Sequence, residues 1–294
     1  MTRPLLGTLA LLVSSCLSVA SPTSTAQTDS TALPSNVERA RAILREGIES
    51  KDFVIRKEAI TAMSMIGRNE ILLMRLEGFL HDKNVEVRLA TLHALADLDS
   101  PKSEGVLRQT LEGDKTPEVS FAAAKVLAGF HDPAGLDALR EVYEGKRKTR
   151  SKILTEKKRS FLDEFHSTES AMMFLVGKGI GYAPLPGAGE GFSAISSLLR
   201  DPTVSDRAQA LLILCRTKSP ESRRLLGEAL HDQDWSVRAM SAQIIAHTAA
   251  TELRDSLLPL FEDKNQKVRF RAAGAYLRLL VAAKQLSVTQ ETIQ

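Results

Sequence analysis

The residues from Val37 onward repeat one pattern of apolar and small positions around six anchor residues. The residue before the anchor is apolar in five of the six cases, and small or apolar residues return three, four and seven positions after it. Offsets of −1, +3, +4 and +7 lie on one side of a helix with 3.6 residues per turn, so each anchor marks an amphipathic helix. The anchors are Arg56, Arg88, Ser120, Arg207, Arg238 and Arg269.

Each of these first helices is followed by a turn and a second amphipathic stretch, as at 69–81, 101–112, 219–231 and 251–262. Proline fits the first position of a helix because it lacks the N–H that would be unpaired there, and Pro101, Pro133 and Pro220 suit the starts of three second helices. No stretch alternates with period two for long enough to predict a strand. The pattern predicts an all-α solenoid of helix pairs.

Aspartate stands six positions before the anchor in five repeats, and Ser50 stands there in the first. We expect this ladder to be structural: each Asp starts a first helix, where an anion suits the helix dipole, and each Arg ties it to a neighbouring repeat. The breaks at Ser50 and Ser120 are then local weak points. Four Asp–Arg pairs keep the full spacing, namely Asp82/Arg88, Asp201/Arg207, Asp232/Arg238 and Asp263/Arg269.

This ladder, in stretches such as DKNVEVRLATLHALADL and DQDWSVRAMSAQIIAH, resembles the short HEAT-like repeats of phycobilin lyases and many bacterial adaptor proteins. The resemblance covers about 37–145 and 190–280. It implies an α-solenoid of HEAT-like helix pairs with a divergent central insert. It says little about function, because such repeats serve enzymes, scaffolds and chaperone-like binders.

The insert is a break in the spacing of the anchors, whose steps are 32, 32, 87, 31 and 31 residues, so that about 25 residues exceed two regular repeats. Its first part, 146–166, has eight basic and three acidic residues, a charge of +5, while the rest of the chain sums to −2. One interpretation is a solvated helix that bridges two half-solenoids. The other is contact with an anionic envelope surface or an acidic partner. The candidate contact residues are Lys146, Arg147, Lys148, Arg150 and Lys152.

The second part of the insert is rich in glycine, with six of the 17 glycines in 177–191. It lacks the GxxxxGK[ST] and GxGxxG spacings of phosphate-binding loops. It is either a connector whose apolar side chains pack on the solenoid, or an apolar loop that docks on a partner or a membrane interface. In the second case Tyr182, Leu185 and Phe192 would be the anchors.

The N-terminus predicts export, because Arg3 is followed by a short apolar run from Leu5 to Val13 and then by uncharged Ser/Thr-rich sequence. Val13-Ser14-Ser15-Cys16 resembles a bacterial lipobox, in which Cys16 would be lipidated. Ser18-Val19-Ala20 and Ser24-Thr25-Ala26 are alternative cleavage sites for a general signal peptidase. A lipoprotein facing the periplasm and a freely secreted periplasmic protein remain open at this point.

Composition limits the function classes. The chain of 294 residues is 43% hydrophobic, 26% charged and 5% aromatic with a net charge of +3, which excludes a disordered, collagen-like or polytopic membrane protein. Two cysteines exclude a disulfide-rich scaffold, and Cys215 fits the core. Few aromatic residues and a mild charge argue against nucleic-acid binding.

Histidine is the remaining source of candidate chemistry. His-Asp occurs at 81–82, 131–132 and 231–232, which is similar to the His-Glu pairs of HEAT-repeat iron hydroxylases. The acidic residue differs, the two ladder pairs are about five repeats apart, and His131 lies at a different turn. A metal site needs three or four converging ligands. HExxH and GxSxG are absent from the sequence. We therefore expect no catalytic, cofactor or metal site.

The predicted organisation is a signal peptide (1–20), a polar linker (21–36), N-terminal repeats (37–145), the insert (146–191), C-terminal repeats (192–282) and a tail (283–294). We expect an exported scaffold or adaptor that presents a concave second-helix surface to a protein in the bacterial envelope. The alternatives are an enzyme of the lyase or hydroxylase kind on the same fold, and an anionic-surface binder that uses the basic segment 146–159.

Overall fold

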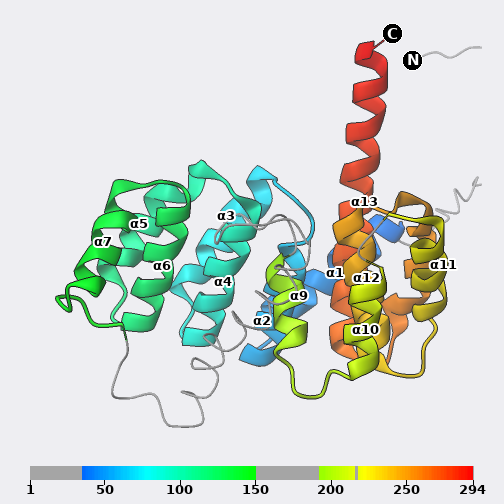
Figure 1. Cartoon of the computed structure of the whole chain (residues 1–294), viewed down its shortest axis with the longest axis horizontal. Coiled ribbons are helices and arrows are strands. Elements are labelled where there is room, and N and C mark those ends of the chain that lie inside the picture. The colour runs from blue at the N-terminus through cyan, green and yellow to red at the C-terminus, as the bar shows by residue number, and fades with distance from the viewer. Residues whose placement is uncertain (1–34, 150–191, 216–217, 294) are drawn as a thin grey trace, which may run out of the picture. The chain divides into compact units, whose positions relative to one another are not determined.

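The computed structural model describes residues 35–149, 192–215 and 218–293, and within these ranges its regular structure is entirely helical (Figure 1). The prediction of an all-α solenoid is confirmed. The predicted signal peptide with Cys16, the linker up to residue 34 and most of the insert, 150–191, lie outside the described residues.

Each anchor falls in a helix. The first helices are α2 (Phe53–Met63), α4 (Val85–Leu98), α6 (Pro117–Gly129), α10 (Asp206–Leu214), α12 (Trp235–Thr248) and α13 (Gln266–Ile293). Four first helices are followed by a second helix of the expected span, and the α12 repeat closes with two 3-10 segments. These are α3 (Glu70–Gly78) with η1 (Phe79–His81), η2 (Pro101–Ser103) with α5 (Glu104–Gly113), α7 (Pro133–Tyr143), α11 (Pro220–Ala229), and η3 (Thr251–Leu253) with η4 (Asp255–Glu262).

Proline opens three second helices as predicted, at Pro101, Pro133 and Pro220. The prediction that the ladder Asp starts each first helix is wrong. In α4 the N-cap is Asn84, whose Oδ1 accepts from Glu86 N at 2.8 Å, while Asp82 Oδ1 accepts from Asn84 N at 2.7 Å. The ladder Asp therefore fixes the turn before the helix, because a separate side chain caps the helix itself.

The helices do not stack in the order of the sequence. Among the first helices, α10 contacts α12, α12 contacts α13, α13 contacts α2, α2 contacts α4, and α4 contacts α6. The two blocks of repeats thus meet directly where α13 packs on α2. α9 (Phe192–Leu199) belongs to none of these helix pairs, and it contacts α12, α2 and α4.

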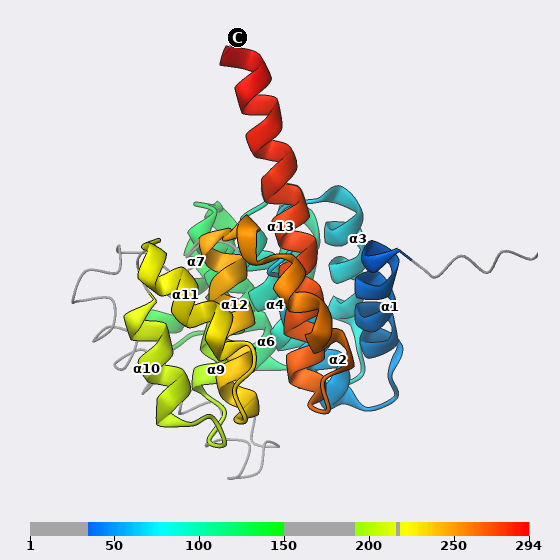
Figure 2. The same ribbon diagram turned by 90° about the vertical axis from the view of Figure 1, so that its right-hand side faces the viewer.

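The N-terminal helix α1 (Asn36–Glu49) supplies the second helix that α13 lacks. It contacts α13, α2 and η4, and Figure 2 shows it beside the lower part of α13. The approach is close: a Cβ added at Gly47 would lie 2.6 Å from Ala59 Cβ and 2.6 Å from Phe270 Cε1. One structural repeat is therefore assembled from the two ends of the described chain.

The core follows the predicted stripe of offsets −1, +3, +4 and +7. In α4 these positions are Val87, Thr91, Leu92 and Leu95, and all four are fully buried. The small residue at +3 permits a neighbouring helix to approach, as the pattern predicts. The only polar member, Thr91, donates its hydroxyl to Val87 O at 2.8 Å, so its burial leaves no donor unpaired.

Candidate binding site

The ladder arginines join consecutive structural repeats. Arg88 donates from Nε and Nη2 to the Asp114 carboxylate at 2.8 and 3.1 Å, and from Nη1 to the backbone oxygen of Asp82 at 2.9 Å. Arg238 repeats this arrangement with Asp263 and with the backbone oxygen of Asp232. Each such Arg therefore holds its own turn and the turn of the following repeat.

The ladder groups are largely occupied by one another. Arg238 and Asp263 side chains are 9% and 7% exposed. Burial alone would raise the pKa of Asp263, but the hydrogen bonds from Arg238 and Asn265 N outweigh it and hold that pKa below its usual value. The hydrogen bond from Arg207 likewise lowers the pKa of Asp232. These charges stabilise the stack and leave few free atoms for a ligand.

The ladder changes where α13 meets α2. Arg269 donates to its own Asp263 O at 2.7 Å, but the next turn in space carries Ser50 and offers no carboxylate at that position. Arg56 still continues the ladder on the other side, with Nε 3.0 Å from Asp82 Oδ2. The break at Ser50 thus coincides with the boundary between the C-terminal and N-terminal repeats.

A second set of charges crosses this boundary, and the sequence analysis missed it. Arg271 of α13 donates to Glu58 of α2 at 3.0 Å and to Ser197 Oγ of α9 at 3.0 Å. Lys267, one turn before Arg271, also lies 3.9 Å from Glu58. Its ion pair with Asp201 and its contact with the Trp235 ring, 5.3 Å from the centroid, stay within the C-terminal part of the chain. Opposite charges at the same +2 offset, Glu58 and Arg271, are the signal that could have revealed it.

The second ladder break, Ser120, is bridged by a residue of the insert. Ser120 donates to Leu111 O at 2.6 Å, and Arg147 Nη1 donates to Ser120 Oγ at 3.2 Å. Arg147 also pairs with Glu141 at 2.8 Å, and Lys146 pairs with Glu144 at 2.6 Å. Two of the basic residues expected to meet an external partner therefore have acidic partners within the chain.

The other predicted contact residues are less informative. Lys148 is exposed and lies in a non-helical stretch. Phe192 is the first residue of α9, and its side chain lies outside the described residues. Four more candidates also lie outside them: Arg150, Lys152, Tyr182 and Leu185. The structure does not bring the predicted contact residues together into one described surface.

Two single residues have perturbed chemistry. Burial, reinforced by Arg200 and Lys125, lowers the pKa of His93 to about 3, so its imidazole is neutral at pH 7. Burial raises the pKa of the Cys215 thiol, which lies 3.6 Å from Ser222 O, so that thiol is unreactive. Across 35–149, 192–215 and 218–293, no three His, Cys, Asp or Glu side chains are grouped to hold a metal ion.

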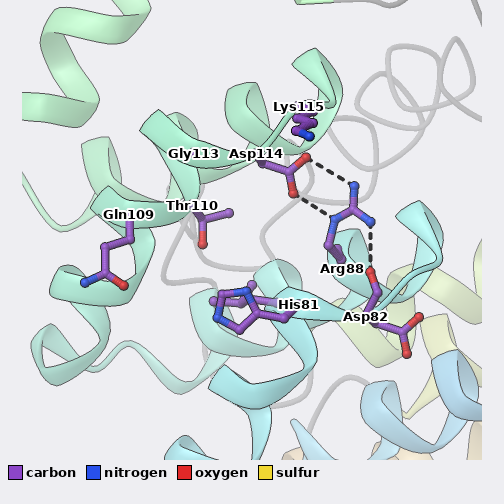
Figure 3. A pocket seen from close by; sticks show the side chains of 9 residues that line it. His81, Asp82, Arg88, Gln109, Thr110, Gly113, Asp114 and Lys115 are labelled. Carbon is purple, nitrogen blue, oxygen red and sulfur yellow. Dashed lines mark hydrogen bonds and ion pairs between the residues drawn. The ribbon is translucent and has the colours of Figure 1, made fainter.

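A groove of about 370 Å³ lies between η1 and the end of α5 (Figure 3). Arg88 and Asp114 on its wall are bound to each other, which leaves His81, Gln109 and Lys115 as polar groups at its rim. Gly113 also lines it, at the register position where Glu, His or Arg stands in the other repeats. These side chains can donate hydrogen bonds to a ligand. They are not arranged as a nucleophile beside a general base.

The most exposed apolar pair on the second helices is on α3. Ile71 and Met74 are 73% and 68% exposed and lie one turn apart on one face. Charged residues surround the pair, including an ion pair of Glu70 with Lys102 of the next second helix. We call Ile71 and Met74 the α3 patch. Within the described ranges no helix is both long enough and apolar enough to cross a bilayer.

Comparison with known proteins places the chain in a repeat family. The pattern that describes HEAT repeats matches residues 72–154 and 193–278. No curated protein matches the sequence. Among solved structures, human deoxyhypusine hydroxylase in complex with glycerol is similar at 15% identity, with a TM-score of 0.33, over 85% of this chain and 90% of that chain. Because the matched segments make up more than half of its residues, this chain belongs to the HEAT-repeat proteins.

Proposed function

We propose that this chain is an exported HEAT-repeat scaffold that binds a protein partner through the α3 patch. The α3 patch is the observation that carries the proposal, because Ile71 and Met74 expose most of their side chains side by side on one helix face. Apolar side chains grouped on a folded surface and rimmed by charge are typical of protein interfaces, where Met is enriched.

The position of the α3 patch also supports a scaffold role. α3 pairs with α4, within the layer of second helices that a solenoid presents as an extended binding surface. The Glu70–Lys102 ion pair joins the α3 repeat to the next one, so the rim of the patch is shared by two repeats. A partner that spans both repeats would bury the apolar centre and leave the charges at the edge.

Export is the second part of the proposal, and the N-terminal sequence supports it. A short apolar run after Arg3 and the lipobox-like Val13-Ser14-Ser15-Cys16 suit a lipoprotein anchored by Cys16, with the following Ser/Thr-rich stretch as its tether. The spacing of 31 and 32 residues suits the short HEAT-like repeat type of bacterial adaptors. Mass spectrometry of the mature N-terminus tests this: acylated Cys16 indicates the anchor, a later start indicates secretion, and an intact Met1 contradicts export.

The partner is best sought by site-specific photo-crosslinking in the cells that make the protein. A photoreactive residue at Ile71 or Met74 should give one crosslinked partner, identified by mass spectrometry. The matched control is the exposed Glu112 on α5. Ile71→Asp combined with Met74→Asp should abolish the complex without unfolding the protein, since both side chains are already exposed. The same crosslinks from position 112, or a complex that survives the double substitution, would refute the α3 patch.

A further inference from the structure

The two ends of the stack expose apolar residues at positions that are buried in other repeats, and this carries a proposal. We infer that the chain associates with a second copy of itself head to tail, with the α10 end of one molecule stacked on the α6–α7 end of the next. The first of these faces is on α10, the second on α7. Among the described helices α7 contacts α6 and α5, whereas α10 contacts α12 and α11. Figure 1 shows α7 at one end of the row of helices and α11, a neighbour of α10, at the other.

The α10 face is identified by its register. The residues at offsets +3, +6 and +7 are no more than 6% exposed in each of the other five first helices. In α10 these positions are Ala210, Ile213 and Leu214; Ala210 is exposed, Ile213 is 48% exposed and Leu214 is 64% exposed. The α10 helix thus keeps the small and apolar residues that accept a preceding repeat, but none of the described helices covers them.

The α7 face is identified by comparison with α5, 32 residues earlier. Leu107 and Leu111 of α5 are 0% and 3% exposed, and they correspond to Leu139 and Tyr143 of α7. Leu139 is partly exposed and Tyr143 is 91% exposed. Leu136, one turn into α7, is also apolar and is 46% exposed. A solenoid usually ends in a polar capping face, and α7 does not provide one.

The two faces are matched because they lie at the opposite ends of one stack of repeats. The stack runs from α10 through α12, α13, α2 and α4 to α6, and each repeat of a solenoid stacks on the next in one direction. Within one molecule this contact is not made, since α13 packs on α2 and leaves α10 and α7 at the two ends. Between two molecules the same stacking interface can continue. Such a contact is heterologous, so it produces open chains rather than closed dimers.

The inference is tested on the full chain by sedimentation velocity across a range of concentrations. The wild-type protein should show larger species as its concentration rises. Leu214→Glu blocks the α10 face and Tyr143→Glu blocks the α7 face, and each should weaken self-association about tenfold or more because a charge would be buried at the contact. Val54→Glu, at an exposed apolar residue on α2 away from both faces, is the matched control and should associate like the wild type.

Mixing the two blocked variants distinguishes a head-to-tail contact from a symmetric dimer. Each variant retains the face that the other has lost, so the mixture should form a one-to-one dimer that does not grow. A symmetric dimer through α10 alone would be weakened by Leu214→Glu, unaffected by Tyr143→Glu and not restored by mixing, which would overturn the inference. A wild type that stays monomeric at all concentrations would also overturn it and assign these faces to another protein. Thermal unfolding of each variant checks that it is folded.

Discussion

Arg271 and Glu58 are 213 residues apart in the sequence and form an ion pair of 3.0 Å, in which the Arg271 side chain is 1% exposed. The pair joins α13, the anchor helix of the last repeat in the sequence, to α2, the anchor helix of the first repeat. It lies next to the place where Ser50 interrupts the Arg–Asp ladder. The charges that hold the two blocks of repeats together are thus different from those that hold neighbours within a block.

Glu58→Gln should destabilise the protein by about 3 kcal/mol, because it leaves the buried Arg271 without its counter-charge. Replacing both residues, Glu58→Met with Arg271→Met, should recover part of this loss, since a buried ion pair can often be exchanged for apolar packing. Urea unfolding followed by circular dichroism measures both free energies of unfolding. A double variant no more stable than Glu58→Gln would show that the instability does not come from an uncompensated Arg271 charge.

The ladder should be strongest where it is most buried. In the Arg88–Asp114 pair the side chains are 13% and 10% exposed, whereas Arg207, which pairs with Asp232, is 67% exposed. Arg88→Ala should therefore cost about 3 kcal/mol of stability, and Arg207→Ala should cost much less, because solvent screens an exposed pair. The same unfolding experiment compares them. Equal losses would mean that burial does not set the strength of the ladder.

The composite repeat of α1 and α13 should be sensitive to one methyl group. Gly47→Ala places a Cβ 2.6 Å from Ala59 Cβ, and overpacking of this kind costs about 1–3 kcal/mol. Gly105→Ala on α5 is the control, because a Cβ there meets nothing within 4 Å. That change should stabilise the protein by up to about 1 kcal/mol through helix propensity. If Gly47→Ala unfolded at the wild-type temperature, α1 would not be packed tightly between α13 and α2.

Acid should destabilise the protein through His93. Its pKa is about 3 in the folded chain and about 6.5 when unfolded. Between these values the unfolded state binds the extra proton, so the contribution of neutral His93 is complete above pH 6.5 and is lost as the pH falls toward 3. The loss approaches about 1.4 kcal/mol per pH unit.

His93→Gln should remove this part of the pH dependence, and His81→Gln, at an exposed histidine, should not. The measurement is the free energy of unfolding of both variants and the wild type at several values between pH 7 and pH 4. Comparing slopes cancels the carboxylates, which titrate in all three proteins. Parallel curves for the wild type and His93→Gln would contradict the assignment.

The periodic pattern was sufficient to place the helices, because apolar residues at helical spacing, such as Val87, Leu92 and Leu95, mark the side of each helix that is buried. Proline positions gave the starts of three second helices for the same local reason. The turn geometry was harder: Asp82 was expected to begin a helix, but Asn84 caps it, since both residue types fit an N-cap and only the backbone decides between them. The Arg271–Glu58 pair was missed because the repeat pattern does not say which repeats face each other, so two opposite charges at the same +2 offset are not recognised as partners.

The sequence by itself therefore determined the repeat, the buried side of the first helices other than α10, and the residues of the ladder. Only the tertiary structure decided which repeat lies beside which. The stacking positions are chemically alike in all repeats. The pattern therefore shows that each helix packs against a neighbour, but it does not determine which helix that neighbour is. The neighbour of α13 was fixed by contacts across the whole chain: the close approach at Gly47, and the opposite charges of Arg271 and Glu58.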